Sequence, residues 1–311
     1  MEAGVGAQSA RSGSSGLAPA VSGPLALAVV RDYITLTKPR IIALLLVTTV
    51  ATMLVADPAG PALTTVLWTV VGGYLAAGGA GAINHYLDRE RDARMARTRS
   101  RPLVSGRIEP FHGLVFGIAL GLLAFVQLWL TVNLLAASLA MAGLLGYVFV
   151  YTLWLKPLTP QNIVIGGAAG AMPPLVGWAA ATGGLSLDAL WPFAIVFLWT
   201  PPHFWALSLL IKDDYARTGV PMLPVVKGEE ETRRQILAYS VALSLFTLLP
   251  VATGLFGAIY LAAAALLGGA FCLLAARLWT GRGRREALRL YLFSLSYLAL
   301  LFAAMAVDRV A

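Results

Sequence analysis

Residues 84–92 read NHYLDRERD and lie where a long apolar segment gives way to a run rich in arginine. Asn84, Asp88 and Asp92 are spaced four apart, so on a helix they follow one face over about 12 Å. Carboxylates at the C-terminal end of a helix meet the negative end of its dipole, which is destabilising by itself. The pattern therefore predicts a cation among them, and Mg²⁺ is favoured because it commonly joins protein carboxylates to substrate phosphates. The alternative is an ordinary solvated helix end beside cytoplasmic arginines.

The composition is that of a membrane protein. Of 311 residues, 59% are hydrophobic and 12% are charged, whereas about a quarter of the residues in a soluble protein are charged. This predicts an all-α, polytopic membrane protein built as one helical bundle. The net charge of +8 would also suit nucleic acid, but the positive-inside bias of membrane proteins accounts for it. Cys272 is the only cysteine and fits a packing role.

Apolar runs long enough to cross a bilayer, about 20 residues each, recur along the chain. They predict nine transmembrane helices, near residues 37–56, 62–84, 111–130, 133–155, 162–182, 188–210, 235–255, 258–279 and 287–307. With a cytoplasmic N-terminus, 22 of the 23 Lys and Arg residues fall in cytoplasmic segments and Arg309 alone falls outside. The positive-inside rule therefore predicts that orientation.

Residues 1–30 are rich in Ala, Gly and Ser and lack the apolar core of a secretory signal. We expect a disordered cytoplasmic tail there, followed by a transmembrane domain at residues 31–311. A mitochondrial transit peptide fits less well because the segment has few arginines.

Basic residues near the acidic motif are candidates for binding a phosphate group. Arg97 and Arg101 follow the motif directly, and guanidinium groups match phosphate oxygens. The simpler explanation is that these arginines only set the orientation. Lys38, Lys156 and Lys212 are predicted on the same cytoplasmic side and are further candidates for the same anion.

A second acidic-basic loop, Lys212-Asp213-Asp214-Tyr215, follows the sixth predicted helix. Asp213 and Asp214 are predicted as further metal ligands, although a polar loop at a helix end is the simpler explanation. Since helices two and six run in the same direction and both end in such a loop, a duplicated four-helix unit is a further hypothesis.

His203 lies within WTPPHFW, residues 199–205. Aromatic side chains beside an imidazole suit a planar macrocycle, with His203 approaching its iron, although a lone histidine in a bundle commonly only packs. His85 is a second candidate for this role. Pro201 and Pro202 predict a break in the helix. The run of small residues at 166–174 predicts a close helix approach and a kink.

Together these segments resemble the UbiA-type intramembrane prenyltransferases. Asn84, Asp88 and Asp92 match the family's Asn-x-x-x-Asp-x-x-x-Asp signature. Similarity to the heme-farnesylating branch extends over roughly residues 31–305, through the continuation at 92–103, LTKPR at 36–40, NIVIGG at 162–167, PPLVGW at 173–178, TPPHFW at 200–205 and GVPMLPVV at 219–226. The wider family has a second Asp-x-x-x-Asp motif, and this chain has the Lys212 to Tyr215 loop instead.

The resemblance implies helices arranged around a central cavity in a bacterial cell (cytoplasmic) membrane, with Asn84, Asp88 and Asp92 as catalytic residues and metal ligands. It implies Mg²⁺-dependent transfer of farnesyl from farnesyl diphosphate to a vinyl group of heme b, with water addition, giving heme O and diphosphate. Heme b is then a substrate, expected near His203 and His85, and heme A synthase is a candidate partner. Basic groups and Mg²⁺ would neutralise the leaving diphosphate as its charge develops.

Two other functions stay open at this point. One is prenyl transfer to a quinone precursor or a chlorophyllide, by another member of the same family. The other is a secondary transporter, which would move its substrate without chemical change. A purely structural subunit gives no reason for paired carboxylates at a helix end.

Overall fold

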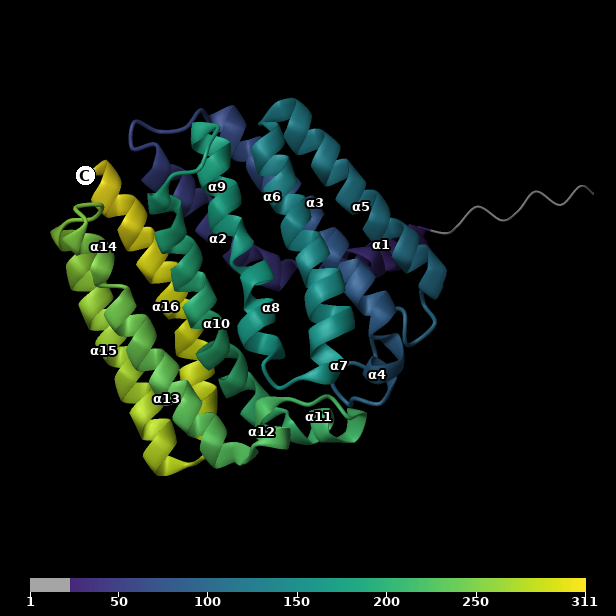
Figure 1. The fold of residues 1–311 in the computed structure, drawn as a ribbon. Helices are drawn as coiled ribbons and strands as arrows, with labels where there is room; N and C mark the ends of the chain where they lie inside the picture. The colour runs from purple at the N-terminus through teal and green to yellow at the C-terminus, as the bar shows by residue number, and fades with distance from the viewer. Residues whose placement is uncertain (1–22) are drawn as a thin grey trace, which may run out of the picture.

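The computed structural model describes residues 23–311, and every regular element in that range is helical (Figure 1). Nine helical segments of the described chain are long and apolar enough to cross a membrane, at residues 39–56, 63–87, 110–131, 134–158, 162–182, 187–210, 228–252, 258–281 and 284–310. The predicted all-α, multi-span fold is therefore confirmed. The predicted central cavity and the predicted duplication stay predictions.

Several of the spans are assembled from more than one helical element. In chain order the elements are α1 Gly23–Thr37, α2 Pro39–Ala56, α3 Leu63–Leu87, α4 Arg89–Ala93, α5 Pro110–Thr131, α6 Leu134–Leu145, the π-helix η1 Gly146–Leu155, α7 Lys156–Leu158, α8 Asn162–Gly170, α9 Met172–Thr182, the 3₁₀ turn η2 Leu187–Ala189, α10 Leu190–Leu210, α11 Lys212–Thr218, α12 Leu223–Val226, α13 Gly228–Phe246, α14 Leu249–Ala252, α15 Ala258–Gly281 and α16 Arg284–Val310.

Two boundaries differ from the sequence prediction. Helix α1 begins at Gly23, within the segment expected to be a tail. Residues 1–22 lie outside the described residues, and the division at residue 31 stays a prediction. The seventh span begins at Gly228 rather than near residue 235, because its first turn holds the acidic side chains of residues 229–231. Those carboxylates suit the positive end of the helix dipole, although they lower the local hydropathy.

The predicted break at Pro201 and Pro202 is wrong, because α10 runs unbroken through both prolines. Each proline lacks an N–H and so leaves one carbonyl of the preceding turn without its helical partner. The carbonyls concerned are those of Phe197 and Leu198, and helix bundles tolerate such losses. Within residues 166–174, where a kink is predicted, Ala171 separates α8 from α9.

Helix α3, which carries the acidic motif, packs tightly on α5. A Cβ added to Gly79 would lie 2.7 Å from the carbonyl oxygen of Gly117, so glycine is required for the two backbones to come this close. Helix α2 packs against both α9 and α16 and so connects the two halves of the bundle.

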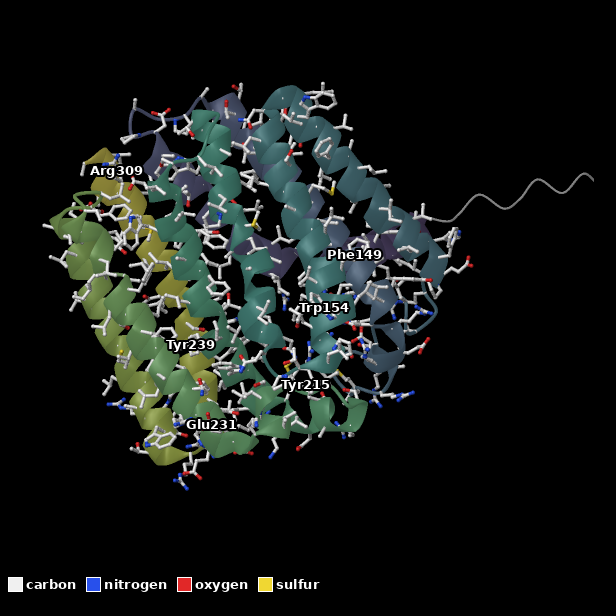
Figure 2. The ribbon with its side chains drawn as sticks, in the orientation of Figure 1. Phe149, Trp154, Tyr215, Glu231, Tyr239 and Arg309 are labelled. Carbon is white, nitrogen blue, oxygen red and sulfur yellow. The ribbon has the colours of Figure 1, made fainter. Side chains whose placement is uncertain are left out.

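Charged residues separate between the two ends of the bundle. Figure 2 places Arg309 at the end opposite to Tyr215 and Glu231. The end that carries Tyr215 also carries α4, α7 and α11 (Figure 1), which hold the basic and acidic loops. The cytoplasmic placement of that end, and of the N-terminus, stays a prediction.

Candidate functional site

The acidic motif lies on one buried face at the end of α3. The backbone N–H of Asp88 donates to the Asn84 carbonyl at 2.9 Å, and that of Asp92 donates to the Asp88 carbonyl at 2.8 Å. The helical path therefore continues from α3 into α4 with little interruption. The relative solvent exposures of Asn84, Asp88 and Asp92 are only 4%, 2% and 5%. Three polar side chains buried this deeply require partners.

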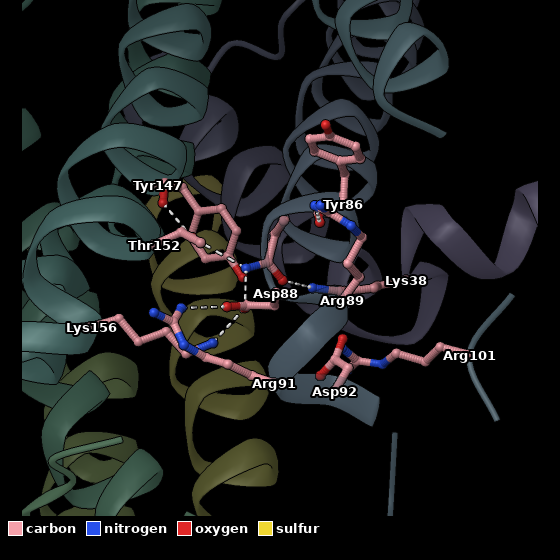
Figure 3. A network of polar contacts seen from close by, with 11 residues as sticks. Lys38, Tyr86, Asp88, Arg89, Arg91, Asp92, Arg101, Tyr147, Thr152 and Lys156 are labelled. Carbon is pink, nitrogen blue, oxygen red and sulfur yellow. Dashed lines mark hydrogen bonds and ion pairs between the residues drawn. The ribbon is translucent and has the colours of Figure 1, made fainter. Parts of the chain in front are cut away.

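Asp88 is the centre of the resulting network (Figure 3). Its Oδ2 accepts from Lys156 Nζ at 2.5 Å and from Asn84 Nδ2 at 2.8 Å, and its Oδ1 accepts from Arg91 at 3.2 Å. Burial by itself raises the pKa of Asp88, but Lys156, Asn84 and Arg91 more than offset this and hold the pKa below its usual value. Asp88 is therefore an anion at neutral pH.

Asp92 pairs with Arg101, whose guanidinium lies 2.5 Å from Asp92 Oδ2. The Thr98 hydroxyl donates to the Asp92 carbonyl at 2.9 Å, which folds the intervening loop back onto α4. Arg97 is exposed and makes no ion pair within residues 23–311. Of the two arginines singled out from the sequence, the structure brings only Arg101 into contact with the motif.

Lys38 reaches the motif from the junction of α1 and α2. Its Nζ donates to Asn84 Oδ1 at 2.7 Å and lies 5.9 Å from the centre of the Tyr147 ring. Its backbone has φ 59° and ψ 56°, a left-handed conformation that is costly for lysine and for a residue preceding proline. Burial, assisted by Arg101 and Lys156, lowers the pKa of Lys38 to about 7.

The π-helix η1 supplies a further wall of the site, one that sequence reasoning missed. Thr152 Oγ1 accepts from Asn84 Nδ2 at 3.2 Å and donates to the Tyr147 carbonyl at 2.9 Å. The rings of Tyr147 and Tyr151 stack with centres 5.3 Å apart. The opposite face carries Phe149 and Trp154, which are more than half exposed (Figure 2). Such π-helical turns are rare and frequent at functional sites, but hydropathy carries no signal for one here.

The second acidic loop is placed differently from the prediction. Lys212 pairs with Glu229 at 3.2 Å, Asp214 pairs with Arg217, and Asp213 is exposed. No group of three or more His, Cys, Asp and Glu side chains able to hold a metal occurs in the described part of the chain. Metal binding by Asp213 and Asp214 therefore stays a prediction without support from their contacts.

Tyr215, in the same loop, is the residue that approaches the motif. It is 8% exposed. Burial raises its pKa, and Arg97, Asp88 and Arg101 are near enough to act on it as well. In the second loop the buried side chain is therefore Tyr215, whereas Asp213 is exposed and Asp214 pairs with Arg217.

The two histidines occupy different surroundings. His85 is 3% exposed, and neither of its ring nitrogens has a hydrogen-bond partner among residues 23–311. His203 Nδ1 lies 2.6 Å from the Ser294 hydroxyl of α16. Its ring stacks on Trp199 and Tyr291. Ser294 lies 91 residues from His203 in the sequence, and no motif marks it.

The donor chemistry of the motif fits a hard divalent cation. Asn84, Asp88 and Asp92 offer amide and carboxylate oxygens on one face, which are the ligands that Mg²⁺ prefers. Those oxygens accept hydrogen bonds from Lys38, Lys156, Arg91 and Arg101. Basic groups thus outnumber carboxylates within the network, and the surplus positive charge suits a phosphate-bearing ligand.

Nine apolar helices in the described residues, with a buried acidic and basic network at one end, are the features of a multi-pass membrane protein. The chain belongs to the UbiA prenyltransferase family, whose model matches residues 45–300. A protoheme IX farnesyltransferase of Roseiflexus is 55% identical over 282 residues, which are 91% of this chain and 53% of that protein. The protoheme IX farnesyltransferase of Synechocystis is 51% identical over 90% of both chains. This chain therefore spans about half the length of the Roseiflexus relative and most of the Synechocystis relative.

Solved structures show the same fold. A structure of digeranylgeranylglyceryl phosphate synthase superposes with a TM-score of 0.75 at 20% identity, over 91% of this chain and 99% of that one. A UbiA homologue from Archaeoglobus fulgidus bound to GPP and Mg²⁺ superposes with a TM-score of 0.67 at 16% identity, over 88% and 99%.

Proposed function

We propose that this protein transfers the farnesyl group of farnesyl diphosphate to a vinyl group of heme b, with addition of water, giving heme O and diphosphate. The observation that carries the proposal is the buried network of Asp88 with Lys156, Asn84 and Arg91. It lies in a chain about half of whose residues are identical to those of relatives named for this reaction. The supply of heme O to a heme A synthase and a bacterial cytoplasmic location belong to the same proposal.

Farnesyl transfer requires an allylic C–O bond to break, which separates a carbocation from diphosphate. Lys38, Lys156 and Arg101 are placed to neutralise that diphosphate, because each now bonds to the motif that would hold it. Their effect is greatest in the transition state, where the negative charge on the leaving group develops. Asn84 orients the Asp88 carboxylate through the 2.8 Å hydrogen bond from its amide.

Asn84, Asp88 and Asp92 would hold Mg²⁺, which when bound supplies positive charge that connects the diphosphate to the carboxylates. The Archaeoglobus fulgidus homologue, bound to a prenyl diphosphate and Mg²⁺, supports this assignment. The aromatic wall of Tyr147, Tyr151 and Tyr215 limits the access of water to the reacting carbon. All three side chains are largely buried.

The test is an assay of the purified full chain with farnesyl diphosphate, Mg²⁺ and heme b, followed by mass spectrometry of the extracted heme. A product heavier by one farnesyl group and one hydroxyl group, with release of diphosphate and a proton, supports the proposal. Conversion of 4-hydroxybenzoate with no change to heme b would overturn it in favour of a quinone-precursor prenyltransferase. Movement of an unmodified substrate across proteoliposomes would instead indicate a transporter.

A further inference from the structure

The Ser294 hydroxyl is the hydrogen-bond partner of His203 Nδ1. The Ser294 hydroxyl donates its one hydrogen to the Tyr291 carbonyl at 2.6 Å. Its oxygen can then only accept from His203 Nδ1, which lies 2.6 Å away. With the hydroxyl hydrogen on the Tyr291 carbonyl, the matching tautomer of the neutral imidazole has its proton on Nδ1 and its lone pair on Nε2.

The His203 ring is also held in orientation. Trp199 stacks on it with centres 4.2 Å apart and planes 19° apart, and Tyr291 stacks on it at 4.9 Å and 28°. Trp199 Nε1 donates to the Ser294 carbonyl at 2.8 Å, which ties the stack to α16. Because Trp199 and Tyr291 stack on the imidazole, a ligand can approach the ring only at its edge.

Nε2 is at that edge. Nε2 makes no hydrogen bond in the part of the chain that the structure describes. It differs from the two ring nitrogens of His85, which also lack partners, in not being fully enclosed by protein atoms. His203 lies seven residues before the end of α10, about 10 Å along the helix from the end where the acidic loops lie. A fixed lone pair at this depth suits an electrophilic metal centre.

We propose that Ser294 is a positioning residue that presents Nε2 of His203 as an axial ligand to the iron of the heme substrate. The inference rests on the proposed function, since it takes heme as the acceptor. Metal-binding histidines generally donate their second ring N–H to an oxygen, and this fixes the tautomer and raises ligand basicity. This agrees with the approach of His203 to the iron that the sequence pattern predicted, and it adds Ser294 as the group that holds the imidazole.

The experiment is heme b titration into the purified full chain, followed by resonance Raman spectroscopy of the ferrous complex. We expect an iron–histidine stretching band in the unmodified protein. His203→Gly should remove the band, and added imidazole should restore it. Ser294→Ala should shift the band to lower frequency and weaken heme binding about tenfold or more, the size typical for loss of a partner behind a metal ligand.

Two further variants separate positioning from general packing. Ser240 is also fully buried and also donates to a helix carbonyl, at 2.7 Å, so Ser240→Ala is the matched control and should leave the band unchanged. Ser294→Thr keeps the hydroxyl and should recover most of the affinity.

The outcomes distinguish this inference from the proposed function. An unchanged band in His203→Gly, in a protein that still converts heme b to heme O, overturns the inference and leaves the function standing. Equal band shifts in Ser294→Ala and Ser240→Ala would overturn the positioning role of Ser294. If the unmodified protein neither binds nor converts heme b, the function fails and the inference fails with it.

Discussion

Lys156 Nζ lies 2.5 Å from Asp88 Oδ2, and this ion pair joins segments that are 68 residues apart in the sequence. Both partners are largely buried, with side-chain exposures of 13% and 3%. Removal of one member of such a pair leaves an uncompensated charge, which costs roughly 3–5 kcal/mol, whereas removal of both costs less. A substitution at Asp88 or Lys156 should therefore change both the proposed reaction and the free energy of unfolding.

This pair predicts non-additive stability effects. Asp88→Asn and Lys156→Met should each lower the free energy of unfolding by roughly 3 kcal/mol. The double variant should lose clearly less than the sum, because neither charge is then left alone. Denaturant titration of the detergent-solubilised protein measures all three values, and simple additivity would contradict the prediction.

Asp88→Asn should also lower the rate of diphosphate release about 100-fold or more, the usual size when a preorganised charge is lost from an active site. Glu90→Gln is the matched control, because Glu90 lies two residues along with a side chain that is 81% exposed. The control should retain nearly full activity. Equal losses in the two variants would indicate a general charge effect.

Arg101 and Arg97 should differ strongly. Arg101 is bonded to Asp92, so Arg101→Gln should reduce farnesyl transfer by about 10-fold to 100-fold. Arg97→Gln should reduce it less than about threefold, since an exposed cation contributes little through screened interactions. Steady-state kinetics with farnesyl diphosphate measure both, with Arg99→Gln as the exposed control.

Lys38 should show separable backbone and charge effects. Lys38→Gly and Lys38→Ala both remove the ammonium and should weaken diphosphate binding equally. Glycine accepts the positive φ of 59°, so the glycine variant should be more stable than the alanine variant by about 1 kcal/mol. Thermal unfolding and diphosphate titration test the two effects independently, and equal stabilities would show that the left-handed backbone is not maintained.

Chelation of divalent metal should abolish turnover, and addition of Mg²⁺ should restore it. Asp92→Asn should raise the Mg²⁺ concentration needed for half-maximal activity about tenfold, because Asp92 is a buried member of the motif. Asp213→Asn should leave that concentration unchanged, because Asp213 is exposed. A shift for Asp213→Asn equal to that for Asp92→Asn would place a metal at the second loop.

The sequence by itself determined the number of spans and the position of the acidic motif. Hydropathy has a length scale set by the bilayer, and carboxylates four apart share a helix face wherever the helix lies. Resemblance then connected that motif to prenyl transfer. These inferences depend on local spacing, and so they need no knowledge of which helices are neighbours.

Only the tertiary structure decided which residues become hydrogen-bond and ion-pair partners of the acidic motif and of His203. The π-helix η1, the unbroken α10 and the packing of α16 bring distant segments together. This packing places four residues that local spacing did not: Lys156, Thr152, Tyr215 and Ser294. Helix α10 runs unbroken through two prolines; helix bundles tolerate prolines in this way, whereas local propensity predicts a break. Ion pairs and imidazole tautomers depend on contacts between residues on different helices. Nothing in the spacing of those residues along the sequence indicates which of them come into contact.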